Sequence, residues 1–444
     1  MKRLIYAMVA VALMVGAYSC GESSDEPFIN NGGQEEPTPE PEPDPTPTPD
    51  PEPTPTPDPD EPQVAPAFHS TGFMKGSTMC FAQYMVDLGL VYREGGVVTD
   101  PYVSMKNHGS NIVRLQLNIE DFPVYNGATI DWASWNRVVA DAKKADANGM
   151  DIMLTLKPDA DDYTTSGANH NLAPAVWESI KNDEQALGDA LYEWVYTTLY
   201  NLAKEGIYPR VVAVGNEVNI NFIGPSASSN DASRTGRLLA RGFAAVRAYS
   251  EKYNPDMLSL LHIADPAKVS SYVSRIKAAG GDDFDVIGVS WYPGYGHSIA
   301  YTSMEAMVAA SEQNYGYPMM ILETAYGFTN GNLNGVWKGD WCNNAYNDPA
   351  WSDNEADYSP ANQRAWLRSL AEQVKNGGGL GVITWGTESL PDTLTGKEQG
   401  HGMGLYTYPA DWAYGSTWEN NSYWDFTHDN NLHEGIDWMM DIAE

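Results

Sequence analysis

Two glutamates that end runs of apolar residues are the clearest sign of chemistry in this chain. Glu217 closes the stretch VVAVGNE, and Glu323 lies inside MMILETAYG. Each run of β-forming residues predicts a buried strand that delivers a carboxyl group to the following loop. Two such groups in one cleft can act as the acid/base and the nucleophile that cleave a glycosidic bond with retention. Either glutamate alone would fit an ordinary surface ion pair, but the two together favour catalysis.

Eight strand-like runs alternate with amphipathic stretches, and these elements must position the two glutamates. Alternating strands and helices predict an α/β protein with a parallel sheet, here a single (β/α)8 TIM barrel with long βα loops. Residues at the carboxyl ends of the strands line the active-site face of such a barrel. The predicted strands are Phe73–Lys75, Ile112–Leu117, Asp151–Leu156, Val211–Asn216, Met257–Ile263, Val286–Ser290, Met319–Glu323 and Gly381–Trp385.

Long loops follow the seventh and eighth strands, over residues 324–358 and 386–421, and both are rich in aromatic and polar residues. Their tryptophans are candidate platforms for stacking sugars, although each one alone is more often a core residue. These are Trp337, Trp341, Trp351, Trp412 and Trp418. The predicted helices are Trp132–Asn148, Glu184–Glu205, Ala232–Tyr253, Ser270–Ala279, Met304–Asn314 and Ala361–Asn376, with a closing helix over 432–442.

The N-terminus has the features of an exported lipoprotein. Lys2 and Arg3 precede an apolar run too short to span a membrane, which predicts a signal peptide over residues 1–19. Cys20 then resembles the lipidated first residue of a bacterial lipoprotein, although Tyr18 departs from the usual processing site and a simple secreted protein stays open. The acidic residues that follow resemble those that direct some lipoproteins outward. We therefore expect an outer-membrane lipoprotein at the cell surface, in contact with the membrane only through its lipid.

Residues 20–66 are predicted to be a linker, because from Pro37 to Pro62 proline alternates with threonine and acidic residues. Such a stretch has no apolar side chains to bury and favours polyproline II, which would extend on the order of 80 Å. The catalytic domain is then expected over residues 67–444, and we expect it to be a monomer.

The chain carries a formal net charge of −33, and residues 67–444 hold 46 acidic against 24 basic side chains. A domain with this excess of acidic side chains repels nucleic acid, and a neutral polysaccharide is favoured as its partner. The sequence has no HExxH or paired-cysteine motif, so no metal or other cofactor is expected, and no motif supports a structural calcium in the acidic loops. Cys80 and Cys342 would suit a disulfide in an exported protein, but small buried cysteines are as common, and the pairing stays open.

Longer motifs along the body resemble glycoside hydrolase family 53, the endo-β-1,4-galactanases of a large retaining clan of (β/α)8 barrels. The resemblance covers nearly the whole body, and GNE followed by ETAYG is its most specific part. It is carried by KGSTMCFAQYMVDLG at 75–89, NIVRLQLN at 111–118, PAVW at 174–177, VVAVGNEVN at 211–219, IGVSWYPGYG at 287–296, ILETAYG at 321–327, GLGVITWG at 379–386 and TWENNSYWDF at 417–426.

The resemblance implies roles for several residues. Glu217 would be the general acid/base and Glu323 the nucleophile, with Arg114 and Tyr292 beside Glu323. The further substrate-binding residues that we expect are Asn216 at the sugar 2-hydroxyl, Trp385 under the sugar that is cleaved, and Trp291 next to Tyr292.

Three positions depart from the family pattern. Thr78 stands where the family usually carries Asp, and Gln116 stands where a second Arg is usual. Lys157-Pro158-Asp159-Ala160 replaces a His-Tyr-Ser-Asp segment. All three positions are predicted to lie at the active-site face, so Lys157 and Asp159 are expected to make polar contacts with sugar hydroxyls. The alternative is that Lys157 forms a surface salt bridge away from the cleft.

These observations predict an endo-acting retaining glycoside hydrolase, an arabinogalactan endo-β-1,4-galactanase that cleaves β-1,4-galactan by a two-glutamate double displacement. One alternative is the same chemistry on another neutral β-glycan, such as mannan, xylan or glucan. A second alternative is a catalytically weak surface lipoprotein that binds glycans, which the three departures allow and the two glutamates argue against.

Overall fold

The structure is a computed structural model of the whole chain. It describes residues 61–87, 89–119, 124–125, 128–129, 131–162, 169–226, 231–292, 303–329, 358–390 and 419–443. Within these ranges, no helix is long and apolar enough to cross a membrane. Several residues singled out in the sequence lie outside the described ranges, namely residues 1–60 with Cys20, together with Cys342, Trp337, Trp341, Trp351, Trp412 and Trp418.

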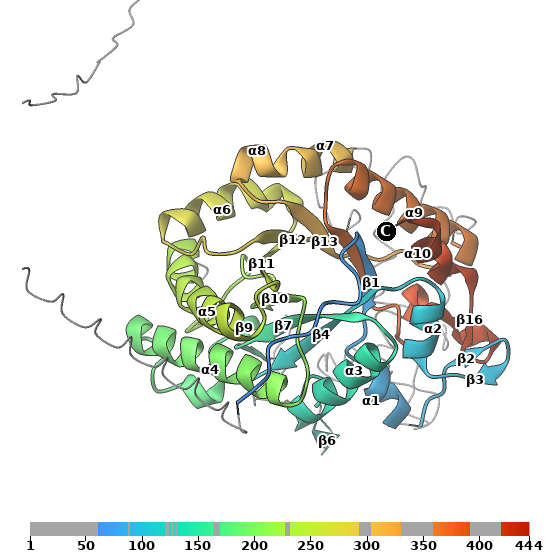
Figure 1. The fold of residues 1–444 in the computed structure, drawn as a ribbon, viewed down its shortest axis with the longest axis horizontal. Coiled ribbons are helices and arrows are strands. Elements are labelled where there is room, and N and C mark those ends of the chain that lie inside the picture. The colour runs from blue at the N-terminus through green and yellow to red at the C-terminus, as the bar shows by residue number, and fades with distance from the viewer. Residues whose placement is uncertain are drawn as a thin grey trace, which may run out of the picture. The chain divides into compact units, whose positions relative to one another are not determined.

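Eight parallel strands close into a barrel at the centre of the fold (Figure 1). Each strand pairs with its neighbours in the order β1, β14, β13, β12, β11, β10, β7, β4, and β4 closes the circle on β1. This arrangement confirms the predicted TIM barrel, and every predicted strand overlaps an observed one. The strands are β1 (Met74–Thr78), β4 (Ile112–Asn118), β7 (Asp151–Lys157), β10 (Val211–Val214), β11 (Leu258–Ala264), β12 (Val286–Ser290), β13 (Met319–Glu323) and β14 (Gly381–Thr384).

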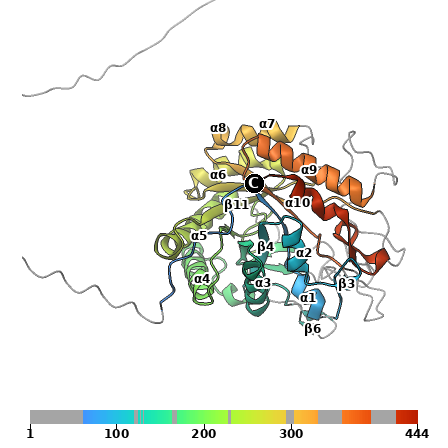
Figure 2. The ribbon, with the colours of Figure 1, turned by 45° about the vertical axis from the view of Figure 1, so that its right-hand side comes forward.

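Helices surround the barrel and cover the outer face of its strands, as the two ribbon views show (Figures 1 and 2). The six long helices predicted from the sequence are present in the described part of the chain, although the one expected over 304–314 is split at Ala310 into two short helices. The described α-helices are α1 (Ala82–Asp87), α2 (Pro101–Asn107), α3 (Trp135–Ala147), α4 (Glu184–Lys204), α5 (Ala232–Tyr253), α6 (Val269–Ala278), α7 (Met304–Ala309), α8 (Ser311–Tyr315), α9 (Pro360–Asn376) and α10 (Trp438–Asp441).

Two short helices, α1 and α2, were not predicted. The signal for α2 was present, since Asp100 caps its first turn by accepting a hydrogen bond from the Tyr102 N–H, and Pro101 occupies the position where proline is best tolerated. The closing helix expected over 432–442 is also shorter than predicted, because the chain there forms a 3-10 turn at Glu434–Asp437 before α10. Because these helices are too short for a full hydrophobic period, the periodicity of apolar residues did not indicate them.

The remaining short strands form small sheets outside the barrel. A four-stranded sheet joins the C-terminal segment to the region after α1, and a hairpin of β8 and β9 follows β7. The short strands are β2 (Arg93–Glu94), β3 (Val97–Val98), β5 (Val124–Tyr125), β6 (Ala128–Thr129), β8 (Ala160–Asp162), β9 (Asn169–Leu172), β15 (Trp424–Asp425) and β16 (Asn431–Leu432).

Successive side chains of each barrel strand point alternately inward and outward, and this creates two hydrophobic cores. The larger core lies between the strands and the helices. The smaller core fills the interior with apolar residues from the strands, such as Ile112, Met153 and Leu260. Two residues further along the same strands, the inward positions become polar at Arg114 and His262, which are both fully buried. Inward-facing residues occur at every second position of a strand. Inside the barrel they therefore form an apolar layer, followed by a polar layer closer to the carboxyl ends of the strands.

The last residues of the expected linker pack against the barrel domain. The Ala65 N–H donates to the Tyr253 carbonyl oxygen over 2.7 Å, and the Tyr208 hydroxyl donates to the Gln63 carbonyl oxygen over 2.9 Å. The Tyr253 hydroxyl also donates to a carboxylate oxygen of Glu61 over 2.8 Å. The compact body therefore begins at least six residues before the boundary that we expected from the end of the proline repeat.

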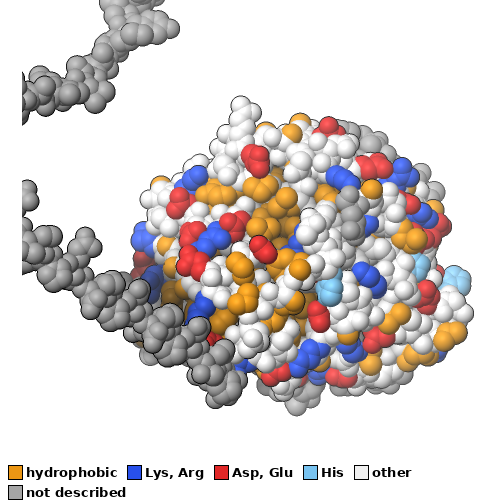
Figure 3. Space-filling model, in the orientation of Figure 1, with side chains coloured by type: hydrophobic (Ala, Val, Ile, Leu, Met, Phe, Trp, Pro, Cys, Tyr) orange, Lys and Arg blue, Asp and Glu red, His pale blue; other side chains and the backbone are white. Residues whose placement is uncertain are grey.

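Acidic and basic side chains are interspersed on the face shown in Figure 3. Several pair between neighbouring helices, for example Arg237 with Glu184 and Arg241 with Asp189 across α5 and α4. Exposed pairs of this kind are each worth about 0–1 kcal/mol, so they add little stability. On this face the basic side chains lie among the acidic ones and form no separate cationic block.

Two carboxyl groups are buried beside the barrel, and they should make stability fall as the pH rises. Burial raises the pKa of Asp141 on α3 to about 8, and burial also raises the pKa of Glu388 after β14 to about 8. In the unfolded chain both groups ionise near pH 4. The unfolded state therefore binds fewer protons between about pH 4 and pH 8, and across this window each group lowers the stability by up to about 1.4 kcal/mol per pH unit.

Glu388→Gln and Asp141→Asn are each expected to flatten this decline, because an amide carries no proton to lose. Urea unfolding at several pH values between 5 and 8 would measure the slope, with Glu251→Gln as a matched control at an exposed position on α5. Slopes equal to that of the unmodified protein in both buried variants would show that these carboxyl groups do not remain protonated in the folded state.

Candidate active site

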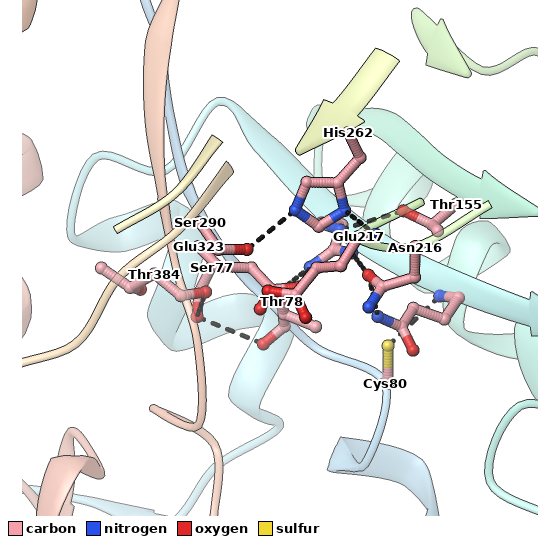
Figure 4. A network of polar contacts seen from close by, with 12 residues as sticks. Ser77, Thr78, Cys80, Thr155, Asn216, Glu217, His262, Ser290, Glu323 and Thr384 are labelled. Carbon is pink, nitrogen blue, oxygen red and sulfur yellow. Dashed lines mark hydrogen bonds and ion pairs between the residues drawn. The ribbon is translucent and has the colours of Figure 1, made fainter. Parts of the chain in front are cut away.

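The carboxyl ends of the barrel strands bring together a cluster of polar side chains, drawn in Figure 4. Glu217, which follows β10, and Glu323, which ends β13, both belong to this cluster. The two glutamates singled out from the sequence therefore come from different strands to one end of the barrel interior.

A β-bulge turns Glu323 towards the barrel interior. Along β13, Leu322 already faces the inner core, so simple alternation would turn the next side chain outward. The pairing between β12 and β13 shifts at this point, because Val289 lies opposite Ile321 whereas Ser290 lies opposite Glu323. One extra residue on a strand re-aims the side chain that follows it. Glu323 thus lies beside the inward residue Ser290.

Two hydrogen-bond donors hold the carboxyl group of Glu323, which is only 6% exposed. Arg114 donates from Nη1 to Oε1 over 2.5 Å, and the Tyr292 hydroxyl donates to Oε2 over 3.3 Å. Both donors stabilise a negative charge on the carboxyl group. This is the environment that a carboxylate nucleophile needs, and it agrees with the expected placement of Arg114 and Tyr292.

Arg114 connects Glu323 to the Asn-Glu pair after β10. Its guanidinium is fully buried, and it donates from Nη2 to the Asn216 Oδ1 over 2.8 Å and from Nε to the Thr155 Oγ1 over 3.0 Å. Its guanidinium carbon also lies 5.6 Å from the centre of the Trp385 ring. The planar fork of arginine can satisfy several acceptors at once, which a lysine cannot do.

The contacts of Asn216 orient its amide group. Arginine only donates hydrogen bonds, so the atom of Asn216 that faces Arg114 must be its carbonyl oxygen. The same oxygen accepts from Nε2 of Gln116 over 3.4 Å. Gln116, one of the three departures, therefore supports Asn216 from β4, which is separated from β10 by β7. Thr78, a second departure, lies 3.5 Å from the Arg114 Nη1.

The Trp385 ring is supported by a row of aromatic side chains. The rings of Phe81 and Trp385 form a T-shaped pair with centres 6.2 Å apart, and Phe81 stacks on Trp132 with ring centres 4.4 Å apart. Trp385 is 6% exposed. A ring fixed in this way beside Arg114 can act as the floor beneath a sugar, since the C–H faces of a pyranose pack on an aromatic plane.

Trp291 does not belong to the site, and the expectation that it binds substrate is wrong. Its side chain has no exposed surface, and it stacks on Trp366 of α9 with ring centres 5.7 Å apart and planes 8° apart. Successive residues of a strand point to opposite sides of the sheet. Because Tyr292 points inward to Glu323, its neighbour Trp291 points outward to the helix layer.

Lys157 and Asp159 lie in buried positions at the end of β7 and just beyond it. They are 6% and 1% exposed, so Lys157 is not a surface side chain as the alternative reading required. Lys157 follows Met153 and Thr155 in the inward series of β7. Their contact with a sugar stays a prediction.

The sequence reading missed His262 and Ser290, which join the polar layer next to the glutamates. His262 shares a hydrogen bond of 2.8 Å between Nε2 and the Ser290 Oγ, and its Nδ1 accepts the Glu217 N–H over 3.2 Å. The missed signal was a polar residue at an inward position of a strand that is otherwise apolar.

Cys80 is a buried free thiol, and its sulfur accepts the Gln116 N–H over 3.2 Å. Burial raises the pKa of this thiol well above its usual value. Cys342 lies outside the described residues. In the described part of the chain, no three His, Cys, Asp or Glu side chains gather as a metal site would require.

Several known proteins resemble this chain over most of its length. It is 29% identical to the arabinogalactan endo-β-1,4-galactanase of Cellvibrio japonicus, and the match covers 82% of this chain and 89% of that protein. It is 25% identical to the endo-β-1,4-galactanase of Bacillus subtilis, over 77% of this chain and 76% of that one.

Solved structures share the same barrel. The GH53 catalytic domain of Ignisphaera aggregans matches with a TM-score of 0.69 at 23% identity, covering 86% of this chain and 99% of that one. A fungal β-1,4-galactanase matches with a TM-score of 0.62 at 18% identity, covering 83% and 99%. The pattern of the family described as glycosyl hydrolase family 53 matches residues 74–439. With most of its length matched and the paired strand-end glutamates in one barrel, this chain belongs to glycosyl hydrolase family 53.

Proposed function

We propose that this protein is an endo-acting, retaining glycoside hydrolase that cleaves β-1,4-galactosidic bonds in galactan or arabinogalactan. The observation that carries the proposal is the buried guanidinium of Arg114, which bonds Glu323 and Asn216 at once in a family 53 barrel. The names of the Cellvibrio and Bacillus relatives support galactan as the substrate. The acidic composition supports a neutral polymer.

The proposed reaction has two steps. Glu323 attacks the anomeric carbon while Glu217 gives a proton to the leaving oxygen, and a covalent glycosyl-enzyme forms. Glu217 then removes a proton from water, which attacks the same carbon and releases Glu323. Arg114 and Tyr292 hold the Glu323 carboxylate in place, and Asn216 is oriented to bond the sugar 2-hydroxyl through its amide N–H.

A substrate panel tests the proposal. The soluble protein without its first 60 residues should release short oligosaccharides from β-1,4-galactan early in the reaction, as an endo mode requires, while mannan, xylan and glucan stay intact. Proton NMR of the first products should show the β-anomer, because two displacements restore the configuration. Cleavage of another glycan with galactan untouched, or initial release of the α-anomer, would overturn the assignment.

Arg114→Lys is expected to lower kcat/KM on galactan about 10²-fold or more. Lysine keeps the charge, but its single ammonium cannot bond both Glu323 and Asn216 in the geometry of the guanidinium fork. Arg210→Lys is the matched control, because Arg210 is also largely buried and bonds Asp151 at the opposite end of the barrel. Steady-state kinetics and urea unfolding of both variants would separate the two effects. If both lost stability and activity in the same proportion, Arg114 would have only a structural role.

We further propose that the lipid on Cys20 holds the enzyme at the bacterial surface. The support is the sequence alone, namely the short apolar run before Cys20 and the extended linker after it. Cys20→Ser should move the protein from the membrane fraction to the soluble fraction and leave the kcat/KM of the purified enzyme unchanged. Continued membrane association of this variant would contradict the proposal.

A further inference from the structure

The peptide bond between Asn216 and Glu217 is held at both of its polar atoms. Its N–H, which belongs to Glu217, donates to Nδ1 of His262 over 3.2 Å. Its carbonyl oxygen, which belongs to Asn216, accepts from Nδ2 of Asn171 over 2.9 Å. The next N–H of the loop, that of Val218, donates to the backbone carbonyl oxygen of His262 over 3.1 Å. His262 therefore binds two successive N–H groups around the candidate acid/base.

The backbone at Glu217 needs this support. Its φ is +48°, in the left-handed region that costs a residue with a side chain on the order of 1–2 kcal/mol. The preceding Gly215 has a φ of +85°, and a Cβ there would lie only 2.6 Å from side-chain atoms of Val218 and Phe222. Such a conformation persists only where neighbouring groups hold it. The direction in which the Glu217 carboxyl group points depends on that conformation.

The hydrogen bonds of His262 determine which of its nitrogens carries the proton. The Glu217 N–H can only donate, so Nδ1 must accept and carries no proton. In the neutral ring Nε2 is then protonated, and it donates to the Ser290 Oγ over 2.8 Å. Burial, together with the charge of Arg114, lowers the pKa of His262 well below its usual value, so the ring stays neutral at physiological pH. His262 is thus a permanent hydrogen-bond acceptor for the loop.

We propose that His262 is a positioning residue for Glu217, and that it holds the acid/base at the leaving oxygen by accepting the Glu217 N–H. This inference rests on the proposed acid/base role of Glu217. If His262 cannot accept, the Asn216–Glu217 peptide keeps its contact with Asn171 but loses the one at its N–H. The strained backbone of Glu217 is then held less firmly, and its carboxyl group is directed less well at the leaving oxygen. Arg114 still holds the side chain of Asn216, so recognition of the sugar should change less than proton transfer.

Two variants of His262 separate this role from a general effect on folding. His262→Leu fills the space without an acceptor. His262→Asn places an amide oxygen near the former position of Nδ1 and keeps the bond to the loop. Both would be assayed on β-1,4-galactan and on 2,4-dinitrophenyl β-galactobioside, whose leaving group departs without a proton. The ratio of the two kcat/KM values does not depend on how much of each variant is folded, and kcat/KM reports the steps up to departure of the leaving group.

His262→Leu should lower kcat/KM on galactan by about tenfold or more and on the activated galactobioside by less than about threefold, since general acid catalysis contributes roughly 10²–10⁴-fold in all. His262→Asn should restore the wild-type ratio. Equal losses on both substrates in the leucine variant, or the same altered ratio in the asparagine variant, would overturn the proposal.

Glu217→Ala, assayed beside them, distinguishes this outcome from a failure of the proposed function. If Glu217→Ala shows a leaving-group dependence and His262→Leu does not, only the positioning role is wrong. If Glu217→Ala shows none, the acid/base assignment itself is wrong, and the positioning role is overturned with it.

Discussion

Glu323→Gln is expected to lower kcat/KM on galactan by about 10⁴-fold or more, because the amide cannot attack the anomeric carbon. Glutamine is the better replacement than alanine. Glu323 is the buried partner of Arg114, and removing one member of a buried ion pair typically costs about 3–5 kcal/mol of stability. The glutamine oxygen can still accept from Arg114, so the variant tests chemistry with little change in folding.

Trapping the intermediate would identify the nucleophile directly. A 2-deoxy-2-fluoro-β-galactoside with an activated leaving group should form a stable covalent adduct, because the fluorine slows both steps and the leaving group restores only the first. Intact mass spectrometry should then show one added sugar, and peptide mapping should place it on Glu323. An adduct on another residue, or an active Glu323→Gln variant, would exclude the nucleophile assignment.

Glu217→Ala is expected to lower kcat/KM on galactan by about 10²–10⁴-fold and to have a much smaller effect on an aryl galactoside with a good leaving group. The natural leaving group is a sugar alkoxide, which must receive a proton as it departs, whereas a dinitrophenolate needs none. A series of aryl galactosides of increasing leaving-group pKa should give a steeper dependence in this variant than in the wild type. If the plots of log kcat/KM against leaving-group pKa had the same slope for the two enzymes, the acid/base role would be contradicted.

A control for this comparison comes from the same loop. Ile220 is an exposed side chain three residues after Glu217, and Ile220→Ala should leave the slope of the aryl series unchanged. The control shows whether a simple change in the loop alters leaving-group dependence. A steeper slope in both variants would point to loop disorder and not to lost proton transfer.

The barrel and its two candidate catalytic glutamates could be predicted from patterns in the amino-acid sequence. Short apolar runs rich in β-branched residues, such as Val211–Val214, favour buried strands, and their alternation with amphipathic helices leaves few architectures. Because strand ends in a parallel barrel share one face, Glu217 and Glu323 could be expected together from the sequence. The resemblance to family 53 added Arg114 and Tyr292 as the expected partners of Glu323, and both contact its carboxyl group.

The alternation of side chains between the two faces of each strand also follows from the sequence. Trp291 and Tyr292 are neighbours at the end of one strand, so only one of them can face the interior. The same rule placed His262 two residues after the inward Leu260, and it would have marked a polar side chain beneath the active site. The outward direction of Trp291 and the inward direction of His262 both follow from strand alternation, once one inward residue of each strand is known.

Other features depended on the tertiary structure. Alternation along β13 would turn Glu323 outward, and only the pairing with β12 introduces the bulge that turns it inward. The left-handed conformation of Glu217 likewise depends on contacts with His262 and Asn171, which lie 45 residues away on either side of the loop. Local sequence specifies periods and propensities, but a bulge and a strained turn exist only where neighbouring strands supply the hydrogen bonds that hold them.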